Sequence, residues 1–246
     1  SDESMAKYIR NDLGQSSFNG LFDSKEEAQA AVDQYREAMT GEGDTILGES
    51  VYFILQPQAS FVLMDHNTGY VKAISGGRGE KEVSLSLNRA TNTLRQPGST
   101  FKVITAFAPA LDACGATLST VYYDAPYTVG TKTFRNWYSS RGYFGYATIR
   151  DGITYSMNIV AVRCLMETVT PQLGVEYARN FGITSLTDTD YNAATALGGI
   201  TKGVSNLELT AAYATIANGG MYTEPVFFTK IFDHNGKVLL ENEPET

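Results

Sequence analysis

The sequence predicts an α+β protein in which an antiparallel sheet is flanked by helices. Two pairs of apolar runs, each pair joined by a short turn, lie at residues 60–74 and 226–240 and predict β-hairpins. Between the hairpins lie apolar stretches of more than ten residues, a length typical of helices. A chain of 246 residues can form one large domain, or a domain with an appendage.

The first 50 residues predict a helical linker or appendage. They are polar, and Ser24 precedes a stretch whose apolar residues recur with helical spacing until Gly41. We expect this helix to bury one face, made of Ala28, Ala31, Val32, Tyr35 and Met39. Residues 51–246 are then expected to form the main domain.

The first hairpin is expected to pair residues 60–64 with 70–74, and the second to pair 226–232 with 237–240. Each turn contains asparagine and glycine, the residues that tight turns favour. His66 and His234 fall in these turns, and they are the two histidines of the chain. A Ser-His-Asp triad is therefore not expected, and lysine remains as a catalytic base.

The middle of the chain is expected to be mainly helical. Helices are predicted near residues 99–111, 148–155, 159–168, 171–181 and 206–218. Residues 122–146 are rich in Tyr, Gly and Thr, and we expect them to be irregular. Because long irregular segments within compact domains are often functional, we expect this one near a cleft.

Composition excludes several classes of function. A net charge of −8 and a pI near 4.8 argue against nucleic-acid binding. No run of eighteen apolar residues and no cationic leader occurs, so we expect a soluble chain that begins after any membrane anchor. Cys114 and Cys164 fit no metal spacing and are expected to be buried free thiols. Nothing in the residues calls for a metal or an organic cofactor.

Residues 95–103 run from a Pro-Gly turn into the predicted helix, and they place Ser99 three residues before Lys102. Ser99 at a helix start has an ordinary explanation, since serine is a favoured N-cap. A capping box, however, needs Glu or Gln at the third helical position, as Ser24–Glu27 and Ser205–Glu208 provide. Lys102 places a cation there instead, which costs about 0.3–1 kcal/mol near the positive end of the helix dipole.

Nucleophilic catalysis would explain this lysine. Residues three apart share a helix face, so the Lys102 amine can accept the proton of the Ser99 hydroxyl. Burial would lower the pKa of the amine, and the helix N-terminus would favour developing negative charge. The same spacing occurs at Ser4–Lys7, where we expect an exposed helix end. Spacing alone is therefore weak evidence.

Several segments together resemble the transpeptidase domain of a high-molecular-mass penicillin-binding protein, of the class A bifunctional type found in Gram-positive bacteria. They occur in family order across most of residues 51–232: Gln58–Gly77, Asn88–Ala90, Arg95–Lys102, Asp151–Ala161, Ala196–Gly199 and Leu207–Gly220. The resemblance implies the fold of penicillin-binding proteins and serine β-lactamases. It also implies that residues 51–246 are the N-terminal portion of that domain.

The resemblance implies a role for each of four residues. Ser99 would be the acylated nucleophile and Lys102 its base. Ser156 would relay a proton to the leaving amine, while the Asn158 side chain holds the substrate amide. The chemistry agrees, because acyl transfer needs a nucleophile, a base, a second proton conduit and donors for the oxyanion.

One family motif is missing. Lys-Thr-Gly occurs nowhere in the sequence, and its nearest strings are Lys132-Thr133-Phe134 and Thr201-Lys202-Gly203. We therefore expect a domain that is incomplete at its C-terminal end, as a designed truncation or a nicked product. A companion fragment could complete it, and the activity of the chain alone is expected to be impaired. The membrane anchor and glycosyltransferase half of such proteins are also absent from these residues.

The predicted function is D,D-transpeptidation in cell-wall synthesis, with peptidoglycan stem peptides ending in D-Ala-D-Ala as substrates and β-lactams as acylating inhibitors. By resemblance the site of action is the outer face of the bacterial cytoplasmic membrane. Two alternatives stay open. A β-lactamase or D,D-carboxypeptidase would pass the acyl group to water, although no carboxylate is identified as the base for that step. A non-catalytic β-lactam sensor or structural module would also fit the missing motif.

Overall fold

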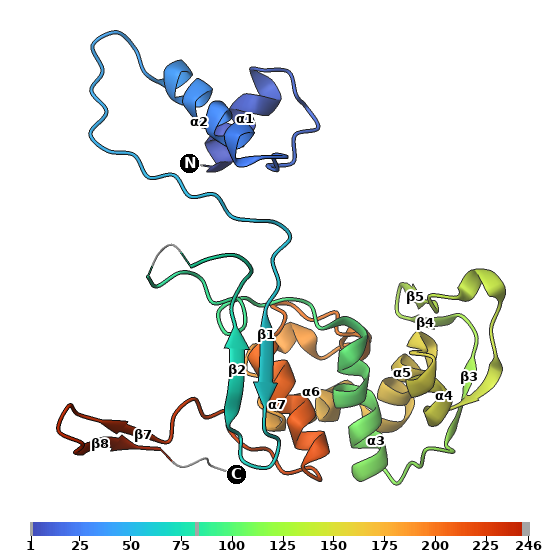
Figure 1. Cartoon of the computed structure of the whole chain (residues 1–246). Helices are drawn as coiled ribbons and strands as arrows, with labels where there is room; N and C mark the ends of the chain where they lie inside the picture. Colours follow the sequence, from blue (N-terminus) through green and yellow to red (C-terminus); the bar gives the residue numbers. More distant parts are fainter. Residues whose placement is uncertain (1, 82–83, 243–246) are drawn as a thin grey trace. The chain divides into compact units, whose positions relative to one another are not determined.

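The computed structural model describes residues 2–81 and 84–242 (Figure 1). It divides into two compact units, Ser1–Pro57 and Gln58–Thr246. The α-helices are α1 (Asp2–Asn11), α2 (Lys25–Met39), α3 (Ala108–Asp112), α4 (Ile149–Thr154), α5 (Asn158–Arg163), α6 (Pro171–Asn180) and α7 (Asn206–Ala217). The strands are β1 (Phe61–Met64), β2 (Val71–Ser75), β3 (Val121–Asp124), β4 (Tyr127–Val129), β5 (Lys132–Phe134), β6 (Gly145–Thr148), β7 (Lys230–Phe232) and β8 (Val238–Glu241).

The first unit is a pair of helices, α1 and α2. Ser24 caps α2 as predicted, since its hydroxyl accepts a hydrogen bond from the Glu27 amide at 3.0 Å. The rings of Tyr8 and Tyr35 join the two helices with centroids 5.5 Å apart. Of the predicted buried face, Ala28 is buried, but Met39 is 56% exposed, which corrects that prediction at the last turn.

Both predicted hairpins are present in the second unit. Strand β1 pairs with β2 and strand β7 with β8, each antiparallel. His66 and His234 lie in the two turns, as predicted. Helix α7 packs on β1 (Figure 1), which matters because a two-stranded sheet alone is marginal in water. The predicted capping box of α7 is formed by Ser205 and Glu208.

The prediction that residues 122–146 are irregular is wrong. This segment contains β4 and β5, which pair with each other, together with most of β3 and the first half of β6, which form a second antiparallel pair. Tyr122 and Phe134 alternate with exposed neighbours and enter the core. The strands are short and contain turn residues, so no period-2 pattern was long enough to predict them.

The predicted helix after Ser99 is present, but it is not regular. It opens as a 3₁₀ turn, Gly98–Thr100, and continues as a π-helical stretch, Val103–Phe107, before α3. Pro109 lacks an N–H group and cannot donate to the Thr105 carbonyl four residues earlier. The π-helical stretch ends just before Pro109, where the Ala108 amide donates to the carbonyl of Val103.

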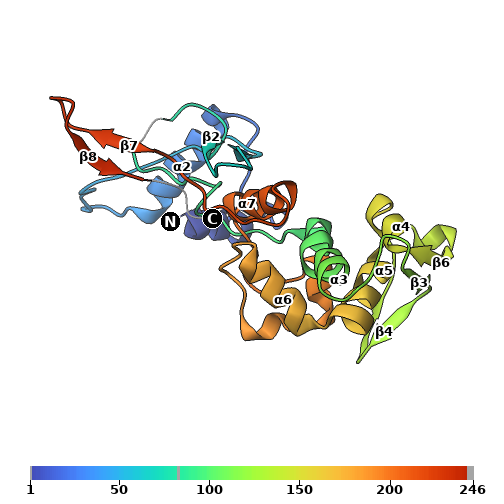
Figure 2. The same cartoon turned by 90° about the horizontal axis from the view of Figure 1, so that it is seen from below.

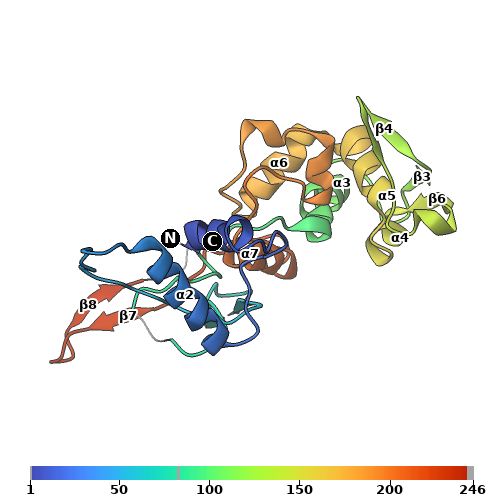
Figure 3. The ribbon, with the colours of Figure 1, turned by 90° about the horizontal axis from the view of Figure 1, so that it is seen from above.

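The core of the second unit surrounds this helical segment. Figures 2 and 3 show α3 between α6 on one side and α5 on the other. Phe107 packs with Val160 and Met157 in one buried cluster, and Phe101 packs with Val175 in another. Cys114 and Cys164 are free thiols as predicted, but only Cys164 is buried. The segment that carries Lys102 is therefore held from both sides.

Candidate active site

The turn that presents Ser99 is built by its neighbours in the sequence. Gly98 has φ +56°, a conformation that a side chain would strain, and it starts the 3₁₀ turn after Pro97. The Thr100 hydroxyl donates to the Pro97 carbonyl at 2.6 Å. Ser99 is exposed at the surface of this turn. Because three residues complete a 3₁₀ turn, positions 99 and 102 lie on the same face.

A loop that is distant in the sequence, at Gly198 and Ile200, packs against the same turn. A Cβ atom on Gly198 would lie 2.4 Å from the Gly98 carbonyl oxygen, so the two backbones approach as closely as glycine permits. Gln96 joins the loop through both ends of its amide. Its Oε1 accepts from the Ile200 amide at 3.0 Å, and its Nε2 donates to the Ile200 carbonyl. No local pattern in the sequence points to Gln96, because its partner lies 104 residues away.

Lys102 is buried, with 2% of its surface exposed. Its Nζ donates to the Ser156 carbonyl oxygen at 2.6 Å and to the Ser156 Oγ at 3.0 Å. Burial lowers the pKa of this amine from 10.5 to about 8, because the charged form loses solvation. A lysine with such a pKa is available as a proton acceptor near neutral pH.

Ser156 lies between α4 and α5, where the sequence predicted a break. Its φ is +50°, an uncommon and strained conformation for a residue with a side chain. The strain is held by the neighbouring residues: Met157 is fully buried, and its amide donates to the Gly152 carbonyl at 2.9 Å. Strain of this kind clusters at functional sites, and here it directs a hydroxyl toward the Lys102 amine.

Asn158 is the first residue of α5. Its Nδ2 donates to the Arg135 carbonyl at 2.9 Å. The next amide, that of Ile159, donates to the Oδ1 of Asn136 at 3.1 Å. Asn136 is buried, and its Nδ2 donates in turn to the Asp124 carboxylate at 2.5 Å. Asn136 and Asp124 are not among the predicted site residues, because they lie in the segment expected to be irregular.

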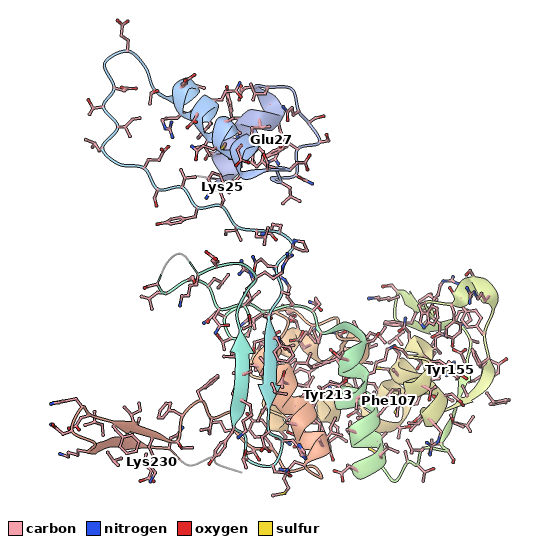
Figure 4. The ribbon with its side chains drawn as sticks, viewed as in Figure 1. Lys25, Glu27, Phe107, Tyr155, Tyr213 and Lys230 are labelled. Atoms are coloured by element: carbon pink, nitrogen blue, oxygen red, sulfur yellow. The ribbon has the colours of Figure 1, made fainter. Side chains whose placement is uncertain are left out.

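The structure thus brings Lys102 and Ser156 into direct contact. Among the residues that it describes, the Ser99 hydroxyl has no hydrogen-bond partner, and no bond joins it to Lys102. Helix α7 also reaches the Ser99 turn, since the Tyr213 hydroxyl donates to the Thr100 carbonyl at 2.7 Å. Figure 4 labels Tyr213, which belongs to α7. It also labels Tyr155, the residue before Ser156, which lies on the side of α4 and α5.

Comparison with known proteins identifies the family. A model described as "Penicillin binding protein transpeptidase domain" matches residues 59–245, which is most of the chain. The chain belongs to this family. The predicted resemblance to class A penicillin-binding protein transpeptidase domains, and the predicted α+β fold class, are confirmed.

Relatives of this penicillin-binding protein transpeptidase domain are much longer. Penicillin-binding protein 1A of Clostridium tetani is 37% identical over 203 residues, covering 77% of this chain and 25% of the relative. Penicillin-binding protein 1F of Bacillus subtilis is 38% identical over 188 residues, covering 76% and 25%. The chain spans about a quarter of the length of these relatives.

Solved structures of penicillin-binding proteins agree with this family assignment. The crystal structure of penicillin-binding protein 1A from Haemophilus influenzae matches with a TM-score of 0.65 at 32% identity, covering 76% of this chain and 27% of that one.

Within the described part of this transpeptidase domain, no helix combines the length and apolar character that crossing a membrane requires. The same residues contain no group of three or more His, Cys, Asp or Glu placed to hold a metal ion.

Proposed function

We propose that this chain carries the acylation centre of a D,D-transpeptidase that cross-links peptidoglycan stem peptides. The observation that supports this most strongly is the contact between Lys102 and Ser156. A buried amine with a lowered pKa is hydrogen-bonded to a strained serine, and it lies one turn from an exposed serine. In this proposal the nucleophile and the base come from one segment, and the proton relay comes from a second segment that contacts the base.

In the acylation step the Ser99 Oγ attacks the carbonyl carbon of the D-Ala-D-Ala bond and gives its proton to neutral Lys102. Backbone N–H groups at the start of the 3₁₀ turn, including that of Ser99, stabilise the oxyanion. The C–N bond then breaks, and the leaving D-alanine amine takes a proton from Ser156, which Lys102 replaces. The contact of 3.0 Å between Lys102 Nζ and Ser156 Oγ is short enough for that relay.

In the second step an amine of another stem peptide attacks the acyl-enzyme. Lys102 accepts the proton of the attacking amine through Ser156, and Ser99 leaves with a proton returned from Lys102. A β-lactam follows the first step only: its ring amide opens on Ser99, and its nitrogen takes the proton but stays attached to the acyl group. The inhibited enzyme therefore carries the opened ring as an ester.

Asn158 is suited to hold the acyl donor. Its Nδ2 is held by the Arg135 carbonyl, and among the described residues no donor contacts its Oδ1. That oxygen can accept the N–H of the donor amide next to the reacting carbonyl. The substrates are then stem peptides and β-lactams, and the reaction takes place on the cell wall outside the cytoplasm.

Mass spectrometry tests the proposal. The protein at its full natural length is incubated with a fluorescent penicillin, digested, and the labelled peptide is sequenced. Ester formation on Ser99 is expected, with an acyl-enzyme that lasts far longer than a β-lactamase turnover. Label on another residue would refute the assignment of Ser99, and rapid loss of label with release of penicilloate would show a hydrolase instead.

A further inference from the structure

Asp190 is a buried carboxylate that has no role in the steps of the proposed reaction. Only 1% of its surface is exposed. Its Oδ1 accepts hydrogen bonds from the amide and the hydroxyl of Thr201, each at 2.8 Å. Its Oδ2 accepts from the amide and the hydroxyl of Thr187, at 2.7 and 3.0 Å. Both oxygens are therefore satisfied, as a buried charge requires.

The two pairs of hydrogen bonds have different explanations. The bonds from Thr187 form a capping box at a short 3₁₀ turn, Asp188–Asp190, which is a local and ordinary role. The bonds from Thr201 come from a residue 11 positions later and serve no cap. Burial raises the pKa of the Asp190 carboxyl, but the four hydrogen bonds lower it by more, so its pKa lies below the ordinary value. The carboxylate is therefore charged at neutral pH.

Thr201 lies in the loop that packs against the Ser99 turn. The Thr201 amide N–H and the Ile200 carbonyl belong to one peptide group, which is a rigid plane. Asp190 accepts from the N–H of this group, and the Gln96 Nε2 donates to its carbonyl. Gln96 lies three residues before Ser99. One rigid peptide group therefore stands between the buried carboxylate and the segment that presents the proposed nucleophile.

This loop, residues 198–204, also pairs with the backbone just before that turn. Arg95 and Val204 exchange two backbone hydrogen bonds, of 2.9 and 2.8 Å. Gly203 has φ +85°, and a Cβ atom there would lie 2.6 Å from the Arg95 carbonyl oxygen. A shift of the loop would therefore also move the chain that leads into the turn.

Asp190 is itself anchored to the helical segment that carries Lys102. Its main-chain carbonyl accepts from the Thr195 hydroxyl, and the Thr195 carbonyl accepts from the Thr105 hydroxyl at 3.3 Å. Thr105 and Thr195 are completely buried. Thr105 lies three residues after Lys102. Asp190 therefore connects the loop next to the proposed nucleophile with the segment that carries the proposed base.

We propose that Asp190 is a positioning residue for the acylation of Ser99. Its carboxylate holds loop 198–204 against the Ser99 turn, and this sets the position of the Ser99 hydroxyl relative to the Lys102 amine. The inference rests on the proposed function and adds to it a group that touches neither the substrate nor the reacting atoms. A displacement of about 1 Å can lower a rate about 100-fold. Loss of the carboxylate should therefore slow acylation without weakening the binding that precedes it.

Stopped-flow kinetics with a fluorescent penicillin separate these two effects. The dissociation constant of the non-covalent complex and the first-order acylation rate constant are measured for the unchanged protein at full natural length and for Asp190→Asn. Asparagine keeps the size of the side chain but replaces one acceptor oxygen with an amino group that faces two donors. We expect the rate constant to fall about 10- to 100-fold and the dissociation constant to change by less than about 2-fold. The fraction of sites that can be titrated should stay the same.

Two threonine variants provide a milder and matched test. Thr201→Val and Thr187→Val each remove one hydroxyl from the same carboxylate, and each hydroxyl also bonds that of Thr189, at 2.7 and 2.8 Å. Only Thr201 belongs to loop 198–204. Thr201→Val should lower the acylation rate constant about 3- to 10-fold, and Thr201→Ser should keep it unchanged. Thr187→Val should stay within about 2-fold of the unchanged protein. This comparison decides the question even where Asp190→Asn does not fold.

Equal falls in Thr201→Val and Thr187→Val would overturn the proposal, because the rate would then follow the general stability of the hydrogen-bond network. A smaller fraction of titratable sites with an unchanged rate constant in Asp190→Asn would overturn it too, since Asp190 would then serve folding alone. Both results leave the proposed function intact. If the unchanged protein forms no ester at Ser99, the proposed function fails, and this inference fails with it.

Discussion

The chain contains two Ser-x-x-Lys segments, and they differ in almost everything except spacing. Ser4–Lys7 lies within α1, and its lysine is exposed. Ser99–Lys102 spans the 3₁₀ turn and the start of the helix that enters the core, and its lysine is 2% exposed. Lys102 reaches a second serine, Ser156, through two hydrogen bonds.

The comparison shows that packing, and not spacing, lowers the pKa of a lysine. The pKa of Lys102 is lowered because the surrounding helices exclude water. Its neighbours in the sequence are buried in apolar clusters: Phe101 with residues of α6, and Phe107 with residues of α5. A serine and a lysine three residues apart on a surface helix have no such neighbours. Four predictions test how far this difference extends.

The largest effect is expected on the nucleophile. Ser99→Ala should lower the second-order rate constant of acylation by a fluorescent penicillin at least about 1,000-fold, because the attacking oxygen is lost. Ser4→Ala should leave it unchanged. Gel fluorescence over a time course measures both variants. Substantial labelling of Ser99→Ala would remove the basis for distinguishing the two segments.

The next effect concerns the base. Lys102→Met should lower the acylation rate constant about 100- to 1,000-fold, since methionine fills the space but accepts no proton. The matched variant Lys7→Met should keep the full rate. Both proteins are expected to be folded, which circular dichroism checks. If the two variants lost activity equally, burial would not be the property that matters.

The pH dependence should report the amine directly. Neutral Lys102 is the reactive form, so below its pKa of about 8 the rate should fall about tenfold per pH unit, and above it the rate should level off. Stopped-flow acylation between pH 5.5 and 9.5 measures the profile. Lys102→Arg cannot lose its proton in this range and should show no such rise. An unchanged profile in that variant would assign the titration to another group.

The smallest effect is on stability. Replacing Lys102 should lower the acylation rate but raise the free energy of unfolding. The folded pKa of Lys102 lies below its unfolded value of 10.5, so protonation favours the unfolded chain. The penalty is full below pH 8, declines as pH rises from 8 to 10.5, and is absent above. Lys102→Met should therefore raise the free energy of unfolding by about 1–3 kcal/mol at pH 7, and by less at pH 10.

Urea denaturation of Lys102→Met and Lys7→Met at the two pH values measures this. The Lys7 variant should stay within about 0.5 kcal/mol of the unchanged protein at both. Destabilisation of Lys102→Met at pH 7 would mean that its two hydrogen bonds to Ser156 outweigh the cost of burying the charge. Lys102 would then favour both acylation and folding, and its two effects would no longer have opposite signs.

Much of the fold was predictable because its signals are local. The hairpin turns, the Ser205–Glu208 capping box and the break at Ser156 each depend on residues within a few positions of one another. The strands between residues 121 and 148 were not predictable, because short segments rich in turn residues form strands only when distant partners pair with them.

By itself the sequence determined which residues could react and placed Ser99 and Lys102 on one helical face. Only the tertiary structure decided that Lys102 is buried, that it contacts Ser156 54 residues away, and that Gly198 and Gln96 hold the Ser99 turn. It also brought Tyr155, the residue before Ser156, together with Trp137 and Phe144 around one cavity. The physical reason is that solvation and hydrogen bonding between distant segments depend on which surfaces meet, and this is set by the packing of the whole core.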